Sequence, residues 1–374
     1  MIIRLMGISF GKTNYRQICQ MFKLVYQDKN MTRSRISSTL DIDRAMVTHI
    51  YQYLVKEGWI KEQPTNLKKL PLRLCENKLF AAGIEIQPEY QILTICNIAG
   101  TIVFEHKWNN KIKSVSDFIL NTACPLLETS EYEVAGAAIA IPGICDTKQS
   151  SILRSVPFNI KESITLPSEI SVKGKNIPLY VENDIRCWSW GKVSFNKEYD
   201  SFMTVIQHFI EDKDDKLRFS RITGGLSFFI NGKPMLGAHG CAGEMPVLFK
   251  VKELQDTGNY LTYEQRLEVR SNKEIAKQFL ENTAITLSYL STVFDAKKIF
   301  ISGFEAFHTK DIENSIKNLL KQYQFYPDLQ HVEIISETSK PEETSRGACG
   351  LVFEELFVRD CETEALDSRL IAKK

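Results

Sequence analysis

The sequence lacks the features of a membrane or secreted protein. No apolar run approaches the roughly 18 residues needed to cross a bilayer, and the apolar start of the chain (MIIRLMGISFGKTNY) is too short for a signal peptide. Its nine cysteines include no CxxC pair, and the chain has no internal repeat or low-complexity segment. We therefore expect a globular, cytoplasmic protein in a reducing compartment, with no membrane partner.

Length and charge indicate more than one domain. At 374 residues the chain is too long for one ordinary hydrophobic core. Residues 1–76 hold thirteen Lys or Arg against six Asp or Glu, whereas the remainder holds 34 against 40. A small basic module joined to an acidic body indicates that only the first part meets a polyanion.

The basic module has the pattern of three helices. Apolar residues recur at helical spacing from Ile18 to Val25, and Thr32 and Asp43 are placed to cap two further helices. Two short helices joined by a tight turn predict a helix-turn-helix, and residues 67–73 (LKKLPLR) could form a small wing. The alternative is a plain three-helix bundle with a solvated face.

The third predicted helix would present hydrogen-bond donors to a major groove, and basic side chains nearby would lie on phosphates. The predicted DNA-binding residues are Arg33, Arg44, Thr48, His49, Gln52, Lys68 and Lys69.

From Leu79 onwards, strand patterns alternate with helix patterns. We expect strands at 79–86, 134–141, 177–181, 201–209, 226–230, 298–302 and 332–335, a strand–turn–strand at 90–106, and helices at 115–127, 182–190, 271–290, 309–323 and 342–357. This order predicts α/β lobes with largely parallel central strands. The expected domains are 1–76, 77–190 and 191–374, with a C-terminal helix that could return to the first lobe.

Two polar segments stand out in the body. Asn183 and Asp184 follow a buried strand, and Glu244 ends the glycine-rich segment 222–244. A glycine-rich loop lets backbone approach a polar ligand, and a lone carboxylate supplies an acceptor. Two simpler interpretations stay open: Asn183 and Asp184 could cap the helix that begins there, and Glu244 could be a surface acid.

These segments resemble the ROK family (repressor, open reading frame, kinase), in its transcriptional-regulator branch. The matching pieces are TRSRISSTLDIDRAMVTHIYQYLVKEGWI, AIAIPGICD, VENDIRCWSWGK, INGKPMLGAHGCAGE and KKIFISGF. The resemblance implies a winged helix-turn-helix followed by two ribonuclease-H-like (actin/sugar-kinase-like) α/β lobes. It also implies that Asn159, Asn183, Asp184 and Glu244 contact a sugar.

The sequence departs from the pattern of ROK kinases at three positions. A phosphate loop with Asp and Gly-Gly-Thr is replaced by residues 85–89 (EIQPE), in which Pro88 lacks an N–H and Glu89 adds a negative charge. A second glycine-rich loop, aligned with residues 221–225, is only partly intact, and Phe304 replaces a glycine near the adenosine. These losses predict a protein that is not an enzyme and has no catalytic residues.

The zinc ligands of the family are also incomplete. The histidine that should follow Glu244 is replaced by Met245, and no cysteine lies between Cys241 and Cys349. His239 and Cys241 are too few for a tetrahedral site. We therefore expect no metal and no cofactor.

Together these features predict a sugar-responsive transcriptional regulator, and specifically a repressor. Its expected partners are operator DNA, a small sugar or sugar-phosphate effector, and further copies of itself in a homodimer or tetramer. Two alternatives remain open: an atypical ROK kinase of a hexose or amino sugar, and a ligand-independent DNA-binding protein with a decayed pocket.

Overall fold

The protein divides into two compact units. The computed structural model describes residues 12–64, 70–197, 201–212, 214–215, 218–244, 261–304, 307, 309–323, 331–338 and 340–359. Unit 1 comprises Met1–Glu198 and Glu342–Lys374, and unit 2 comprises Tyr199–Pro341. None of the described helices combines the length and apolar character that a bilayer crossing requires.

Unit 1 begins with a winged helix-turn-helix. Its elements are α2 (Lys12–Gln27), α3 (Arg33–Leu40), α4 (Arg44–Lys56), β1 (Ile60–Glu62) and β2 (Leu72–Leu74). The predicted caps are present: Thr32 Oγ1 accepts the Arg35 N–H at 3.3 Å, and Asp43 Oδ1 accepts the Ala45 N–H at 2.6 Å. Asp41, with φ of 52°, ends α3 in the left-handed conformation and makes the turn tight. The antiparallel pair β1–β2 forms the wing.

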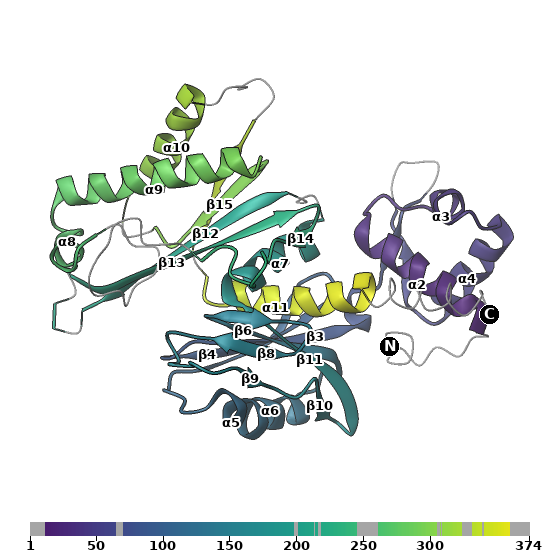
Figure 1. The fold of residues 1–374 in the computed structure, drawn as a ribbon. Coiled ribbons are helices and arrows are strands. Elements are labelled where there is room, and N and C mark those ends of the chain that lie inside the picture. The colour runs from purple at the N-terminus through teal and green to yellow at the C-terminus, as the bar shows by residue number, and fades with distance from the viewer. Residues whose placement is uncertain are drawn as a thin grey trace. The chain divides into compact units, whose positions relative to one another are not determined.

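A six-stranded sheet forms the centre of unit 1 (Figure 1). Its strands are β3 (Phe80–Ile86), β4 (Gln91–Asn97), β5 (Ile102–Trp108), β6 (Val134–Ile141), β10 (Glu169–Val172) and β11 (Lys175–Asn183), in the order β10-β11-β6-β3-β4-β5. A smaller sheet contains β7 (Ile144–Asp146), β8 (Ser151–Arg154) and β9 (Ile164–Thr165), and the short helix η1 (Glu76–Lys78) precedes β3. The central strands β11, β6 and β3 are parallel, as the alternation of strands and helices predicts.

Helices cover both faces of this sheet (Figure 1). They are α5 (Val115–Phe118), η2 (Ile119–Ala123) and α6 (Cys124–Thr129) on one face, and α7 (Asp184–Asn196), α11 (Glu343–Glu354) and η3 (Glu355–Arg359) on the other. Glycines permit close packing there: a Cβ on Gly347 would lie 1.9 Å from the Cys187 carbonyl oxygen, and one on Gly83 would lie 1.8 Å from that of Ser345. Because α7 continues through residue 190, unit 1 extends past the lobe boundary that we placed there.

Unit 2 contains a five-stranded sheet in the order β14-β13-β12-β15-β16. Its elements are β12 (Phe202–Glu211), β13 (Phe219–Ile230), β14 (Lys233–Pro234), α8 (Tyr263–Glu268), α9 (Lys273–Val293), β15 (Lys298–Ser302), α10 (Thr309–Tyr323) and β16 (Glu333–Ser336). The expectation of a loop at 221–225 was wrong. These residues belong to β13 and pair with β12, where Gln207 is opposite Gly224. In an antiparallel pair alternate N–H groups bond to the partner strand, so those of β13 that bond to β12 are not available to a phosphate.

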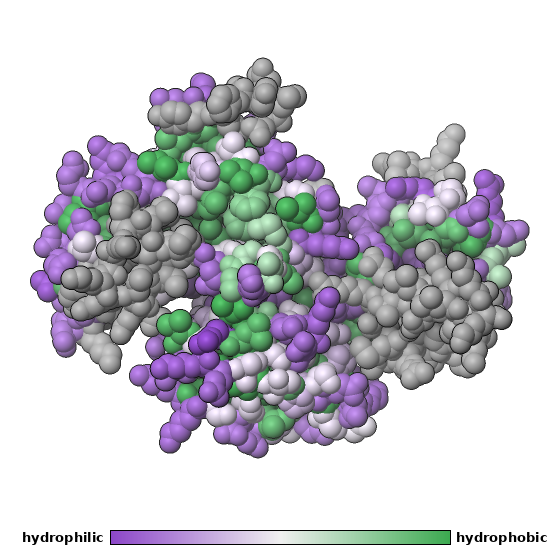
Figure 2. Space-filling model, viewed as in Figure 1, coloured by the Kyte–Doolittle hydropathy of each residue, from purple (hydrophilic) through white to green (hydrophobic). Residues whose placement is uncertain are grey.

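The helix α9 carries an exposed apolar stripe. Ile285, Tyr289 and Val293 are four residues apart, so they lie on one face of the helix. Their exposed fractions are 54%, 69% and 58%. Figure 2 shows hydrophobic side chains gathered over the part of unit 2 where α9 lies in Figure 1.

Aromatic and charged side chains join the winged helix to the rest of unit 1. The ring of Tyr26 on α2 stacks on Phe357 of η3, with 4.8 Å between centroids. Lys197, which ends α7, donates from Nζ to Glu354 Oε1 at 3.0 Å and lies 3.1 Å from the centroid of Tyr26. Burial lowers the pKa of Lys197 to about 8. This junction therefore contains a largely buried ion pair whose cation also contacts Tyr26 of the winged helix-turn-helix.

We expect Lys197→Met to lower the free energy of unfolding by about 3–5 kcal/mol, because Glu354 would stay buried without its cation. The double variant Lys197→Met/Glu354→Leu should recover most of that loss. Lys175→Met is the matched control, since it removes an exposed pair with Glu133 and should cost at most about 1 kcal/mol. Urea denaturation of the four proteins measures this. Equal costs for Lys197→Met and the control would contradict the assignment.

Candidate functional site

Polar side chains gather where the parallel strands of unit 1 end. Glu85 of β3 and Glu182 of β11 are both opposite Ala140 of β6 in the strand register. The three side chains therefore lie in a row on one face of the sheet, with the small alanine between two buried acids. Ligands of open α/β sheets bind outside the carboxyl ends of such strands, so this edge is the candidate site.

Asn183 caps α7 at this edge. Its Oδ1 accepts the N–H groups of Ile185 and Arg186 at 3.0 and 3.2 Å, and its Nδ2 donates to the Gly143 carbonyl oxygen at 3.0 Å. The capping interpretation that the sequence left open is therefore present in the structure. Because both ends of the side-chain amide are engaged, its direct contact with a sugar stays a prediction.

Asp184 is linked to β3 by one glutamine. Gln87 Nε2 donates to Asp184 Oδ2 at 3.0 Å and to Glu85 Oε1 at 3.3 Å. Tyr90, across the turn from Gln87, donates its hydroxyl to the same Glu85 oxygen at 2.9 Å. Residues 85–89, which align with the kinase phosphate loop, thus contact Asp184 through Gln87. The family resemblance implies that Asp184 is a sugar ligand.

The carboxyl group of Glu85 is buried, which disfavours its charged form. Burial raises the pKa of its carboxyl group to about 8; the hydrogen bond from Tyr90 opposes this shift, and the charge of Asp184 adds to it. The pKa of Tyr90 is also raised, first by burial and then by Glu85. At neutral pH the carboxyl group of Glu85 is therefore largely protonated.

A buried ion pair supports the start of α7. Glu182 Oε1 accepts from Arg186 Nε at 2.6 Å and from the Asn183 N–H at 2.8 Å, while its Oε2 accepts from the Thr147 hydroxyl at 3.0 Å. Both partners of the pair are nearly inaccessible. Such a pair holds geometry more than it adds stability, because desolvation offsets its attraction.

Asn159 lies on a turn tied to the same edge. It is exposed, has φ of 52°, and closes the turn by donating its N–H to the Val156 carbonyl oxygen at 3.1 Å. The adjacent Ser155 hydroxyl donates to the Pro142 carbonyl oxygen at 2.6 Å, beside the Gly143 that Asn183 contacts. Its conformation suits an asparagine, and its contact with a sugar stays a prediction.

Glu244 lies in unit 2 on the loop after β14. It is exposed, and its N–H donates to the Cys241 carbonyl oxygen at 3.1 Å. Gly243 ties the loop to β13 by accepting the Leu226 N–H at 3.1 Å. Asp184 belongs to the other compact unit, so joint contact of Asp184 and Glu244 with one sugar stays a prediction.

The side chains near Glu244 do not fit the zinc site that the family resemblance implies. His239 and Cys241 are both exposed, and the Cys241 thiol donates to the carbonyl oxygen of His239 at 3.4 Å. Over the described ranges, no three or more His, Cys, Asp or Glu side chains are grouped as metal ligands. Two ligands cannot complete a tetrahedral zinc site.

Two features of unit 2 also differ from a nucleotide site. Phe304 is buried among Phe209, Phe279 and neighbouring aromatic rings. Asp212, after β12, accepts the N–H of Asp214 at 2.9 Å, which places two acids together in the β12–β13 connection. Like charges repel, so this connection does not favour a phosphate group.

The helix α4 presents Arg44, His49 and Gln52 as exposed side chains, with Thr48 partly exposed. Arg33 lies beside them, and its guanidinium is 3.5 Å from Glu62 of the wing and 4.7 Å from the centroid of Tyr51. It therefore links α3, α4 and the wing. Lys68 and Lys69 lie outside the described residues, and the DNA contacts of all seven residues stay predictions.

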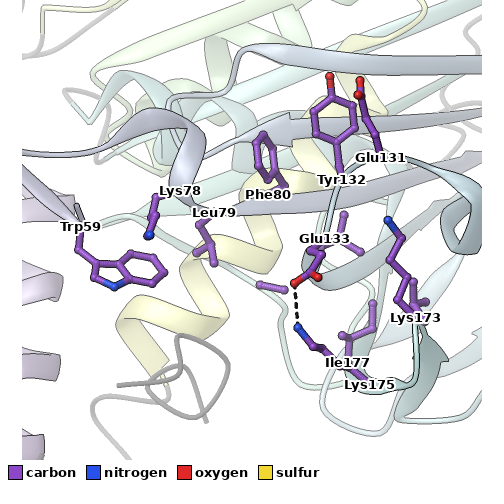
Figure 3. Close-up of a pocket in the computed structure, with 13 residues that line it drawn as sticks. Trp59, Lys78, Leu79, Phe80, Glu131, Tyr132, Glu133, Lys173, Lys175 and Ile177 are labelled. Carbon is purple, nitrogen blue, oxygen red and sulfur yellow. Dashed lines mark hydrogen bonds and ion pairs between the residues drawn. The ribbon is translucent and has the colours of Figure 1, made fainter. Parts of the chain in front are cut away.

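A depression of about 310 Å³ lies between the wing and the central sheet (Figure 3). Lys175 pairs with Glu133 at 2.8 Å, and Lys78 lies 5.1 Å from the centroid of Trp59. Lys173 donates to the Ser130 carbonyl oxygen. Because these cations already have partners in the protein, we assign no ligand to this depression.

The sequence interpretation missed the parts played by Glu85, Gln87, Tyr90 and Glu182. For Glu85 and Glu182, the sequence could have shown this, because each is an acid inside an apolar strand pattern (GIEI and YVEN). Buried carboxyl groups in such runs mark functional candidates.

The chain was compared with proteins of known sequence. Residues 81–246 match the family model described as "ROK family". A xylose repressor of Caldicellulosiruptor bescii is 27% identical over 195 residues, which cover 46% of this chain and 48% of the relative. A xylose repressor of Staphylococcus xylosus is 22% identical over 288 residues, covering 73% and 70%. The match to the C. bescii protein thus spans about half of that relative's length.

Solved structures share the fold. A ROK family transcriptional regulator, described as a homolog of the E. coli MLC protein, has a TM-score of 0.66 at 15% identity, covering 91% of this chain and 96% of its own. A ROK family glucokinase from Streptomyces griseus, solved with glucose and AMPPNP, has a TM-score of 0.50 at 16% identity, covering 73% and 98%. The chain therefore carries a ROK family domain, joined to an N-terminal winged helix-turn-helix in the fold that ROK regulators and sugar kinases share.

Proposed function

We propose that this protein is a sugar-responsive, DNA-binding transcriptional repressor. The main observation behind the proposal is that one chain contains both a winged helix-turn-helix and a ROK domain, and that α2 packs on η3. The capped helix α4 exposes Arg44, His49 and Gln52, which are side chains suited to base edges and phosphates. The repressors named among the relatives support the same proposal.

The state of the phosphate-binding segment favours a regulator over a kinase. Gln87 donates to Asp184, the carboxylate that a ROK kinase would need as a base. Pro88 offers no N–H to a phosphate, and residues 221–225 lie in a strand. The kinase-like solved structures share the fold with this chain, and fold does not carry activity with it.

The helix α7 offers a path between effector and DNA. Its first residue is Asp184 at the candidate site, and Lys197 directly after its end contacts Tyr26 of α2. A helix of 13 residues spans about 20 Å as a rigid element. A ligand that moves the N-terminal end of α7 would therefore also move Lys197, and with it the contact to Tyr26 of the winged helix-turn-helix.

Symmetric operators need paired recognition helices, so the proposal includes a homodimer or tetramer. The apolar stripe of Ile285, Tyr289 and Val293 supports contact between copies, because exposed apolar surface of this kind is typical of an interface.

For DNA binding, we expect Arg44→Ala and Gln52→Ala each to weaken binding to an operator selected from a random library by about 1–3 kcal/mol. Lys56→Ala, in the last turn of the same helix, is the control and should have a smaller effect that is equal for all sequences. Fluorescence anisotropy at several salt concentrations measures this. Unchanged affinity in both test variants would remove α4 from the proposed DNA interface.

For assembly, we expect Tyr289→Asp to shift the protein toward monomers by placing a charge in an apolar contact. The control is Lys277→Asp on the same helix, at an exposed side chain outside the stripe. Sedimentation velocity reports the change. An unaltered dimer in Tyr289→Asp would place the interface elsewhere.

For sugar response, we expect Asp184→Ala to bind operator like the wild type but to lose the effect of sugar. In the wild type, sugar should change operator affinity by roughly 5–150-fold, and operator should change sugar affinity by the same factor. Operator titrations with and without D-xylose or D-glucose measure this. ATP-dependent phosphorylation of either sugar, lost in Asp184→Asn, would instead restore the kinase alternative.

A further inference from the structure

One oxygen of the buried Glu85 carboxyl group lacks a hydrogen-bond partner among the described residues. Oε1 accepts from Tyr90 at 2.9 Å and from Gln87 at 3.3 Å, whereas Oε2 is buried and accepts from none of them. The side chain as a whole is 3% exposed. The carboxyl group is largely protonated at neutral pH. Because Oε1 already accepts two bonds, Oε2 is the oxygen suited to carry the proton. A buried donor without an acceptor is costly, so a ligand atom that accepts from it is favoured.

Asp184 supplies the complementary group. The same Gln87 nitrogen donates to both carboxyl groups, so both lie within hydrogen-bonding reach of one atom. An O–H donor on Glu85 and an acceptor on Asp184 suit a hydroxyl group, which can accept from one and donate to the other. A phosphate has only acceptor oxygens near neutral pH, and its charge would meet that of Asp184.

We propose that Glu85 and Asp184 together bind a hydroxyl group of an uncharged sugar, and that the charge of Asp184 disfavours a phosphate group at that position. This inference rests on the proposed function, since it names the ligand class of the same site. It assigns the turn at residues 87–90 a new role: its side chains arrange two acids around a sugar hydroxyl in place of backbone N–H groups around a phosphate.

The proposal carries a pH signature. Four groups act on the Glu85 carboxyl: Asp184 on α7 raises its pKa, and Tyr90, Gln87 and Lys107 of β5 lower it. Deprotonation removes the donor, so sugar affinity should fall as pH rises through about 8. Tyr90→Phe and Lys107→Met each remove a group that lowers the pKa, so both should move that midpoint upward.

The stability of the protein should also depend on the protonation of Glu85. The pKa of Glu85 is about 8 in the folded protein, against its ordinary value of 4.5 in the unfolded chain. The stability that protonated Glu85 contributes is therefore fully present below pH 4.5 and is lost as pH rises through 8. Glu85→Gln, which cannot ionise, should lack this decline in melting temperature. Lys197 contributes a change above pH 8 in both proteins, and the difference between them isolates Glu85.

The test is calorimetric titration of the full chain with D-xylose, D-glucose and N-acetyl-D-glucosamine, each beside its own phosphate ester, at pH about 6.5 and about 9.5. In the wild type we expect at least one sugar to bind, its phosphate ester to bind at least about tenfold more weakly, and the affinity for the sugar to fall at the higher pH. Glu85→Gln keeps a donor and should retain binding without the pH dependence. Glu85→Leu should lose sugar binding while it keeps operator binding, which shows that it is folded.

Two results would overturn the inference and leave the proposed function intact: a phosphate ester that binds as tightly as its parent sugar, or a pH dependence that survives in Glu85→Gln. Absence of binding by all six compounds in the wild type would instead remove the proposed function, and this inference with it.

Discussion

Much of this structure depends on how the connection between β11 and α7 satisfies its buried polar groups. Glu182 holds Arg186 in a nearly inaccessible ion pair, Asn183 caps the helix, and Asp184 accepts from Gln87 across the sheet edge. Each of these groups would be costly to bury alone. Together they fix the first turn of α7 against the ends of β3 and β6. The positions of Asn183 and Asp184 follow from that turn.

The same helix also links the sugar-kinase-like lobe to the winged helix-turn-helix, which we propose binds DNA. Close packing of α7 on α11 requires the missing Cβ of Gly347, so the backbones of the two helices lie in direct contact there. At its end, Lys197 joins Glu354 and Tyr26 in one buried contact. In a kinase the carboxylate at the start of this helix would act on a substrate hydroxyl. Here we infer that Asp184 acts, through α7, on the contact between Lys197 and Tyr26. The turn at residues 87–90 would help to bind the sugar and would take no part in phosphate transfer.

Local sequence patterns were enough to predict most elements of the fold. Thr32 and Asp43 cap the helices as expected, because a capping side chain needs only the backbone a few residues ahead. The strands at 134–141 and 298–302 and the helix at 309–323 have the predicted bounds. The strand at 226–230 was predicted too short, because Gly224 and Gly225 are typical of a loop. Their place in β13 depends on pairing with Gln207 and Ile206 of the preceding strand β12.

The sequence alone determined the fold class and the departures from the kinase motifs, since these depend on residue identity and on spacing along the chain. Only the tertiary structure decided that Gln87 joins Glu85 to Asp184, that Asn183 is engaged as a cap, and that Tyr26 rests on Lys197. The partners in the first and last of these contacts lie far apart in the sequence. Their hydrogen bonds and altered pKa values arise from burial and distance in three dimensions, which no periodicity in the chain encodes.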